Sequence, residues 1–260
     1  MALGWVNYLS IIIGALNFVS LIIITSIVLS RNPKERINWF FASGFFFIAV
    51  AYLILPLGAF TFIEGTENTP MVLLTKFYGL ALLLGLLMLM ISSIAINHGT
   101  QFVLKWFILI PSILAVAIIS VLLFALDNTN STIWYSMKAV EGSSTPDIQT
   151  SMLFMGAFYP ICLTIVVITF IHLIKAFKQT EDHEIKMCLK YFLAGLSVSI
   201  SMIIPNILSN VLADVWVNAQ ILNGLEFILV TIGITLMLVG FIIKPISRLR
   251  TEEEHVVSVQ

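Results

Sequence analysis

The chain has 260 residues, of which 59% are hydrophobic and 10% are charged, and its mean hydropathy is +1.04. This is more apolar surface than the core of one water-soluble domain can bury, so a soluble domain is excluded. Thirteen Lys and Arg residues against fourteen Asp and Glu residues give a net charge of −1. We therefore expect no nucleic-acid partner, because there is no excess positive charge to bind a phosphate backbone.

Seven stretches of the chain reach the length of about 20 mostly apolar residues that a transmembrane helix needs. Runs such as Leu80–Leu84 are apolar on every side, whereas the strands of a membrane β-barrel alternate. The sequence therefore predicts an all-α, multi-pass protein of the cell membrane, with a seven-helix transmembrane domain over residues 1–243 and a short tail over 244–260. In chain order, the predicted spans are Trp5–Ser30, Ile37–Ile63, Met71–Ile96, Trp106–Leu126, Ser151–Phe177, Tyr191–Ala213 and Ala219–Ile243.

The distribution of Lys and Arg predicts the orientation of the bundle. Eleven of the thirteen basic residues lie in the tail or in the connections at one face, while Lys138 lies at the other face and Lys76 within the third span. Basic residues concentrate on the cytoplasmic side of membrane proteins. We therefore expect the N-terminus outside and the C-terminus in the cytoplasm, with a long outer connection at Asp127–Thr150.

Two charged residues fall inside predicted spans, where an unpaired charge is costly. Lys76 lies about 9 Å below Pro70 and Glu226 about 10 Å below Ala219, at 1.5 Å per residue, so their depths match. The side-chain amides that reach the same layer belong to Asn206, Asn210 and Asn223. These five residues form the predicted ligand-binding site, a polar pocket open to the outside. The alternative is a structural role, in which Lys76 extends toward the surface and Glu226 bonds a neighbouring helix.

The polar residues within the predicted spans indicate no catalytic residues, no metal site and no cofactor. We therefore expect that the protein is not an enzyme. The last span has no lysine before Lys244 to hold retinal, and His172 is the one histidine within a span. A metal or haem site needs several converging ligands. We interpret His172 as an interfacial hydrogen-bonding residue, with a metal or proton-relay role as the alternative, and we expect no disulfide between Cys162 and Cys188.

Two side-chain patterns predict packing. Ser10, Gly14, Asn17 and Leu21 share one face of the first span, which we interpret as helix-packing surface. The aromatic residues of the second span, within Trp39–Phe47, are interpreted as anchors in the lipid and at its interface.

The segment Arg31–Phe41 resembles the first inner loop in the seven-helix N-terminal membrane region of sensor histidine kinases, where short basic loops precede an aromatic-rich second span. The exit from the last span, Ile243–Glu254, is similar to the corresponding stretch of signalling receptors, in which a Pro-x-x-x-Leu opens a cytoplasmic helix. The histidine kinase core, with its phospho-accepting histidine and nucleotide lid, is missing from this sequence. The resemblance thus implies a sensory module without kinase activity.

We therefore expect a receptor-like module, embedded in membrane lipids, that binds a ligand or partner in its bundle. Its signal would pass to a separate cytoplasmic or membrane protein through the Lys175–Lys190 loop or the tail. One alternative is a small-solute transporter built from two three-helix repeats, because spans 1–3 and 5–7 have the same orientation. The other alternative is a non-catalytic accessory subunit of a larger membrane complex.

Overall fold

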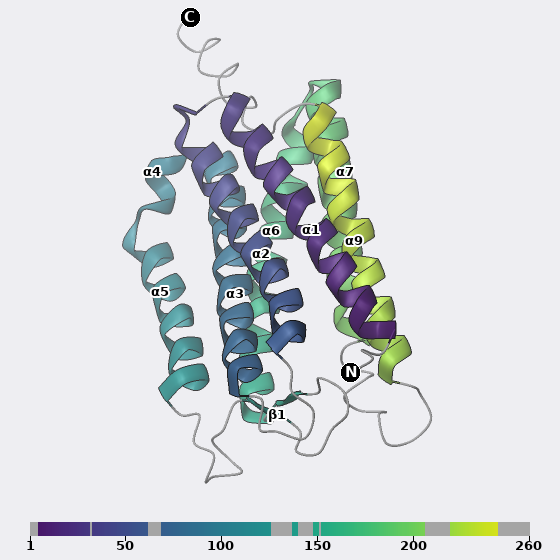
Figure 1. Ribbon diagram of the computed structural model, residues 1–260. Coiled ribbons are helices and arrows are strands. Elements are labelled where there is room, and N and C mark those ends of the chain that lie inside the picture. The colour runs from purple at the N-terminus through teal and green to yellow at the C-terminus, as the bar shows by residue number, and fades with distance from the viewer. Residues whose placement is uncertain are drawn as a thin grey trace, which may run out of the picture.

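The chain forms a bundle of long helices (Figure 1). The computed structural model describes residues 5–31, 33–61, 69–125, 137–139, 148–150, 152–205 and 219–243. Seven helical segments in these ranges are long and apolar enough to cross a membrane, which confirms the predicted helical membrane bundle. The elements are α1 (Trp5–Arg31), α2 (Arg36–Thr61), α3 (Thr69–His98), α4 (Thr100–Val103), α5 (Trp106–Ser120), the π-helical turn η1 (Val121–Ala125), β1 (Met137–Ala139), β2 (Ile148–Thr150), α6 (Met152–Gln179), α7 (His183–Ser201) and α9 (Ala219–Ile243).

Helix α7 begins at His183, earlier than the predicted span at Tyr191. The Asp182 side chain caps it by accepting hydrogen bonds from the backbone N–H groups of Glu184 (2.8 Å) and Ile185 (3.1 Å). Its first turns are amphipathic, because Ile185 is buried whereas Lys186 is exposed. Hydropathy alone marks the apolar part of this helix and misses the polar turns before it.

The connection between α5 and α6 contains a short antiparallel pair of strands, which the sequence analysis did not predict. Met137, Lys138 and Ala139 of β1 pair with Thr150, Gln149 and Ile148 of β2, respectively. Strand β1 contacts α3. This pair therefore lies against the bundle, at the end where α3 begins.

The helices of the bundle pack in one continuous series of contacts. Helix α2 contacts both α1 and α3, and α9 contacts both α7 and α1, while α6 packs on α3. Glycines allow the closest approaches: an added Cβ at Gly195 of α7 would collide with the Gly233 carbonyl oxygen of α9, and one at Gly233 would collide with the Ser199 hydroxyl. The backbones of α7 and α9 are therefore in direct contact, as small residues allow in membrane bundles.

The predicted packing face of α1 is confirmed at Gly14, Asn17 and Leu21, all of which are buried. A Cβ added at Gly14 would stand 3.0 Å from the Pro56 ring of α2. This glycine therefore sets the distance between α1 and α2.

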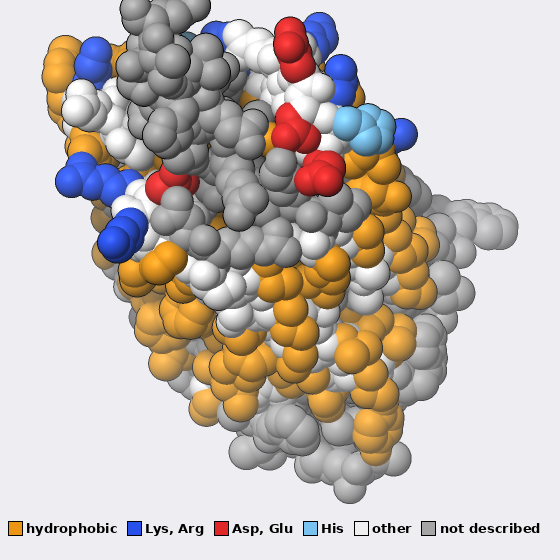
Figure 2. Space-filling model, turned by 90° about the horizontal axis from the view of Figure 1, so that it is seen from above, with side chains coloured by type: hydrophobic (Ala, Val, Ile, Leu, Met, Phe, Trp, Pro, Cys, Tyr) orange, Lys and Arg blue, Asp and Glu red, His pale blue; other side chains and the backbone are white. Residues whose placement is uncertain are grey.

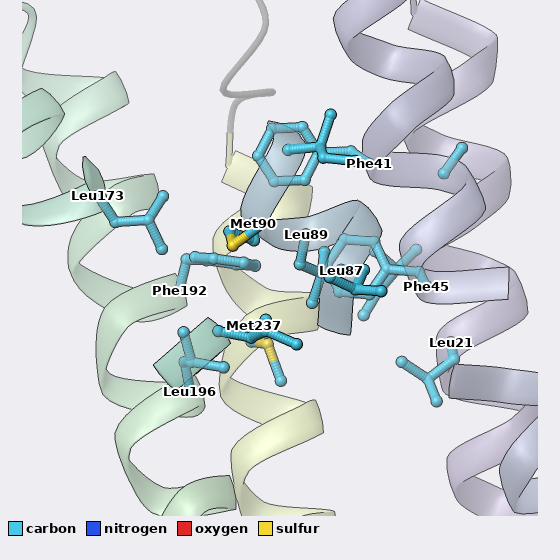
Figure 3. Packing of buried hydrophobic residues seen from close by; sticks show 14 of the residues in the cluster. Leu21, Phe41, Phe45, Leu87, Leu89, Met90, Leu173, Phe192, Leu196 and Met237 are labelled. Carbon is cyan, nitrogen blue, oxygen red and sulfur yellow. The ribbon is translucent and has the colours of Figure 1, made fainter. Parts of the chain in front are cut away.

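The interpretation of the second-span aromatic residues as lipid anchors is wrong for two of them. Phe41 and Phe45 are buried and meet Phe192 of α7 and Phe241 of α9, with ring centroids 5.3–6.5 Å apart. Figure 3 shows Phe41, Phe45 and Phe192 pointing into one shared space. Successive residues of a helix point 100° apart, so a continuous aromatic run supplies core and lipid faces together.

Trp39 fits the anchor interpretation, because it is 54% exposed and its indole N–H donates a 2.8 Å hydrogen bond to the Pro33 carbonyl oxygen.

Charged side chains gather at one end of the bundle, where α2 and α7 begin, above a hydrophobic flank (Figure 2). The exposed basic residues at this end are Lys34, Arg36, Lys105, Lys175, Lys178, Lys186 and Lys190. The positive-inside rule predicts that this end faces the cytoplasm. The orientation of the termini stays a prediction.

Candidate functional site

A cavity in the middle of the bundle, here called the central cavity, is the candidate site. It is lined by side chains from α1, α2, α3, α6, α7 and α9, and it offers about 110 Å³ to the centres of water-sized spheres. One water molecule needs about 10–15 Å³ of such space, so the cavity is large enough for a small ligand. Ligand sites in helix bundles commonly lie between the helices in this way.

Most of the wall is apolar, and the polar side chains on it are few. Phe45, Leu89, Ile234 and Met237 are among the apolar lining residues. The lining residues with polar atoms in their side chains are Tyr52, Tyr159, Cys162 and Ser199.

Tyr78 of α3 and Glu226 of α9 each lie one helical turn from a residue that lines the cavity, on the same face of the helix. Leu82 of α3 and Val230 of α9 line the cavity, and each stands four residues after Tyr78 and Glu226, respectively. Residues four apart on a helix share a face. These two polar side chains therefore lie beyond the lining residues, toward the ends at which α3 and α9 begin.

A carboxylate and three phenols form a polar cluster at this end of the cavity. The Glu226 carboxyl lies close enough to the hydroxyls of Tyr52, Tyr78 and Tyr159 to interact with each of them electrostatically. These four residues, here called the tyrosine–glutamate cluster, come from α2, α3, α6 and α9. In an apolar surrounding a carboxylate needs such partners, since an unpaired buried charge is strongly unfavourable.

The five predicted site residues have different outcomes. Glu226 is half-buried and lies in the tyrosine–glutamate cluster, and Lys76 is buried at 8% exposure. Lys76 and Tyr78 are two residues apart, which separates them by about 200° around the axis of α3. A direct Lys76–Glu226 pair stays a prediction. Asn223 lies on α9 but its side chain is outside the description, and Asn206 and Asn210 lie outside the described residues.

The sequence analysis missed the tyrosines. Tyr78 is only two residues from Lys76, which the sequence does single out. The available signal was depth: a tyrosine in the outer half of a span, away from the interface where tyrosines concentrate, needs a hydrogen-bonding partner.

A second polar cluster lies at the charged end, where α3 ends beside α6. The His98 and His172 rings are 5.5 Å apart, although the sequence analysis placed only His172 in a span. The Asn97 side-chain amide donates hydrogen bonds to the carbonyl oxygens of Ser93 (3.1 Å) and His172 (2.8 Å). The bond from Asn97 uses the backbone of His172, while the ring Nδ1 of His172 is buried without a hydrogen-bond partner. The interpretation of the His172 side chain as an interfacial hydrogen-bonding residue therefore stays a prediction.

A larger apolar space of about 470 Å³, measured in the same way as the central cavity, separates α5 from α3 and α6. The hydroxyls on its wall, of Ser112 and Thr164, donate to carbonyl oxygens of their own helices. This space therefore offers a ligand little beyond apolar surface.

Metal-ligating side chains and cysteines form no site in the described part of the chain. No group of three or more His, Cys, Asp or Glu side chains that could hold a metal ion lies in the described residues. Cys162 and Cys188 are both buried free thiols. No protein-family model matches the sequence, and no curated protein matches it either.

Proposed function

We propose that this integral membrane protein is a receptor-like sensory module that binds a small ligand in the central cavity and passes the signal to a separate protein. One observation carries the proposal: six of the membrane helices, α1, α2, α3, α6, α7 and α9, converge on a cavity with a polar cluster at one end. A ligand there touches several helices at once. Its binding energy can therefore shift the arrangement of those helices, which is what a receptor requires.

The resemblance of Arg31–Phe41 to sensor histidine kinase membrane regions supports a kinase as the class of partner. The connection between α6 and α7 offers a surface for that partner. Lys175, Lys178, Lys186 and Lys190 are exposed around it, and the Lys186 ammonium lies 5.4 Å from the centroid of the Phe177 ring. Clustered lysines of this kind attract an acidic partner surface.

A small-solute transporter is the second candidate, and the position of α5 favours it. The central cavity lies between α1–α3 and α6–α9, whereas α5 stands at the edge of the bundle (Figure 1). This is the layout of two three-helix repeats joined by a linker helix. The apolar wall argues against a sugar as the solute, because a sugar needs many hydrogen-bonding partners.

Ligand binding is tested with the full chain in lipid nanodiscs, by measuring thermal stability against a panel of small amphipathic and polar compounds. We expect at least one compound to raise the melting temperature of the wild type and to lose this effect in Val230→Phe, which fills the cavity. The matched control is Ile232→Phe on the same helix, because Ile232 is 47% exposed toward lipid.

A stabilising effect that persists in Val230→Phe would place the site elsewhere, and no effect from any compound would contradict the proposal. Accumulation of the labelled ligand inside sealed vesicles would favour the transporter. A coupling in stability between substitutions of Lys76 and Glu226, with no effect from any compound, would favour an accessory subunit.

A further inference from the structure

The wall of the central cavity limits the ligand to a mainly apolar body, an argument that rests on the proposed ligand-binding function. Among the described lining residues, the side chains other than Tyr52, Tyr159, Cys162 and Ser199 are Leu, Ile, Val, Phe or Met. A polar ligand body would leave its hydrogen-bonding groups unpaired against this wall, at a cost in affinity. An apolar body gains affinity in proportion to the area it removes from water.

The size of the cavity excludes an ordinary two-chain lipid. Its 110 Å³ corresponds to roughly seven to eleven water-sized groups at 10–15 Å³ each. This is room for a molecule with a short chain or a single ring. A whole membrane lipid does not fit inside the cavity, and we expect a small molecule as its ligand.

The polar groups lie toward one end of the cavity, so the ligand must be amphipathic. On α2, Phe45 and Tyr52 both line the cavity, and Tyr52 stands seven positions after Phe45, which corresponds to about 10 Å along the helix. On α9, Met237 and Val230 line it and Glu226 follows one turn beyond Val230. A ligand that lies along the helices therefore places one end among apolar side chains and the other near the tyrosine–glutamate cluster.

The charge of this cluster indicates the charge of the ligand's polar end. Glu226 is a carboxylate beside three phenol side chains, and aromatic rings and carboxylates both attract cations. An anionic end would be repelled by Glu226 across a medium of low dielectric constant. Among the described residues of the membrane-spanning helices, the other charged side chain in this half is Lys76, which projects from α3 about 200° away from Tyr78.

We infer that the central cavity binds a small amphipathic amine, with its apolar body between α2, α6 and α9 and its ammonium group at the tyrosine–glutamate cluster. Three probes with the same body test this: hexylamine, hexan-1-ol and hexanoate, which are cationic, neutral and anionic at pH 7. Binding to the full chain in nanodiscs is measured by thermal stability and by direct titration. We expect hexylamine to bind most tightly and hexanoate least.

The variant Glu226→Gln keeps the size of the side chain and removes its charge. We expect it to weaken hexylamine binding about tenfold or more, as loss of a hydrogen bond to a charged group does, and to leave hexan-1-ol nearly unchanged. Tyr159→Phe, which removes one phenol hydroxyl, is the second variant in case Glu226→Gln folds poorly, and it should weaken hexylamine binding several-fold. Glu184→Gln, at an exposed site on α7, is the matched control and should change nothing.

Each outcome separates this inference from the proposed function. Hexanoate binding as tightly as hexylamine, or hexylamine binding that survives Glu226→Gln, would overturn the amine as ligand class. If Val230→Phe still abolished that binding, the central cavity would remain a ligand site. Absence of binding by all three probes would also overturn the inference, while the proposed function would then depend on the wider compound panel.

Discussion

The side-chain amide of Asn97 on α3 donates a 2.8 Å hydrogen bond to the backbone carbonyl oxygen of His172 on α6, which lies 75 residues further along the chain. Within an α-helix a carbonyl oxygen also accepts the backbone N–H four residues later. The bond from Asn97 is therefore an additional link, between two helices. Since lipid tails are as apolar as leucine, such polar links help to fix which helices meet.

Asn97→Leu should therefore destabilise the protein by about 0.5–1.5 kcal/mol, the range for a hydrogen bond between membrane helices. The lower part of this range is expected, because Asn97 Oδ1 is buried without a hydrogen-bond partner and its removal offsets some of the loss. Unfolding in mixed detergent micelles measures the effect. The control is Ser112→Ala, whose hydroxyl bonds a carbonyl of its own helix. Equal stability of the two variants would contradict the prediction.

Gly233→Ala should cost about 1–3 kcal/mol, the usual penalty for overpacking, because the added methyl group collides with the Ser199 side chain and the backbone of α7. Gly79→Ala on α3 is the matched control, since nothing lies within 4 Å of its added Cβ. That variant should be neutral or up to about 1 kcal/mol more stable, because alanine favours the helix. Thermal unfolding of both variants in detergent gives the comparison. Similar melting temperatures would show that α7 and α9 are not in backbone contact.

Removing Lys76 and Glu226 singly and together tests whether they share one site. If they pair, each single change leaves a charge in the membrane, so Lys76→Met and Glu226→Gln should show a coupling of about 0.5–3 kcal/mol in a double-mutant cycle. A parallel cycle of Tyr78→Phe with Glu226→Gln serves as the reference, because both residues belong to the tyrosine–glutamate cluster. Coupling in the tyrosine cycle alone would assign Lys76 to a separate role.

The orientation of the bundle can be read with introduced cysteines, since Cys162 and Cys188 are buried and should react little. Pro70 at the start of α3 and Glu181 before α7 are exposed at opposite ends. An impermeant maleimide should label Pro70→Cys in intact cells and Glu181→Cys only after the membrane is permeabilised. The reverse pattern would invert the predicted topology.

The sequence predicts the helices well, because crossing a bilayer demands long apolar runs that hydropathy detects directly. It predicts less about which face of each helix turns inward. Phe41 in the core and Phe46 at 47% exposure have the same hydrophobicity, and only packing separates them. Soluble proteins reveal the inward face by polar residues on the other side, and a lipid-facing surface lacks that contrast.

The candidate site was partly predictable for a related reason. Glu226 is recognisable in the sequence because charge inside a membrane is rare. Tyr52 and Tyr159 have ordinary hydropathy, and their place in the site depends on which residues of other helices lie beside them. The contact between His98 and His172 was missed for the same cause, since their meeting depends on the pairing of α3 with α6.

Ring pairs stand at the two ends of α5: Phe107 of α5 meets Phe102 of α4, and Phe124 of η1 meets Phe77 of α3, each with centroids 5.3 Å apart. Between these contacts lies the 470 Å³ apolar space. A bilayer leaves no vacuum beside a protein, so acyl chains of neighbouring lipids must complete the packing that the chain leaves open. The free energy that holds α5 in place therefore belongs partly to the membrane, and it will vary with the length and saturation of the lipids around it.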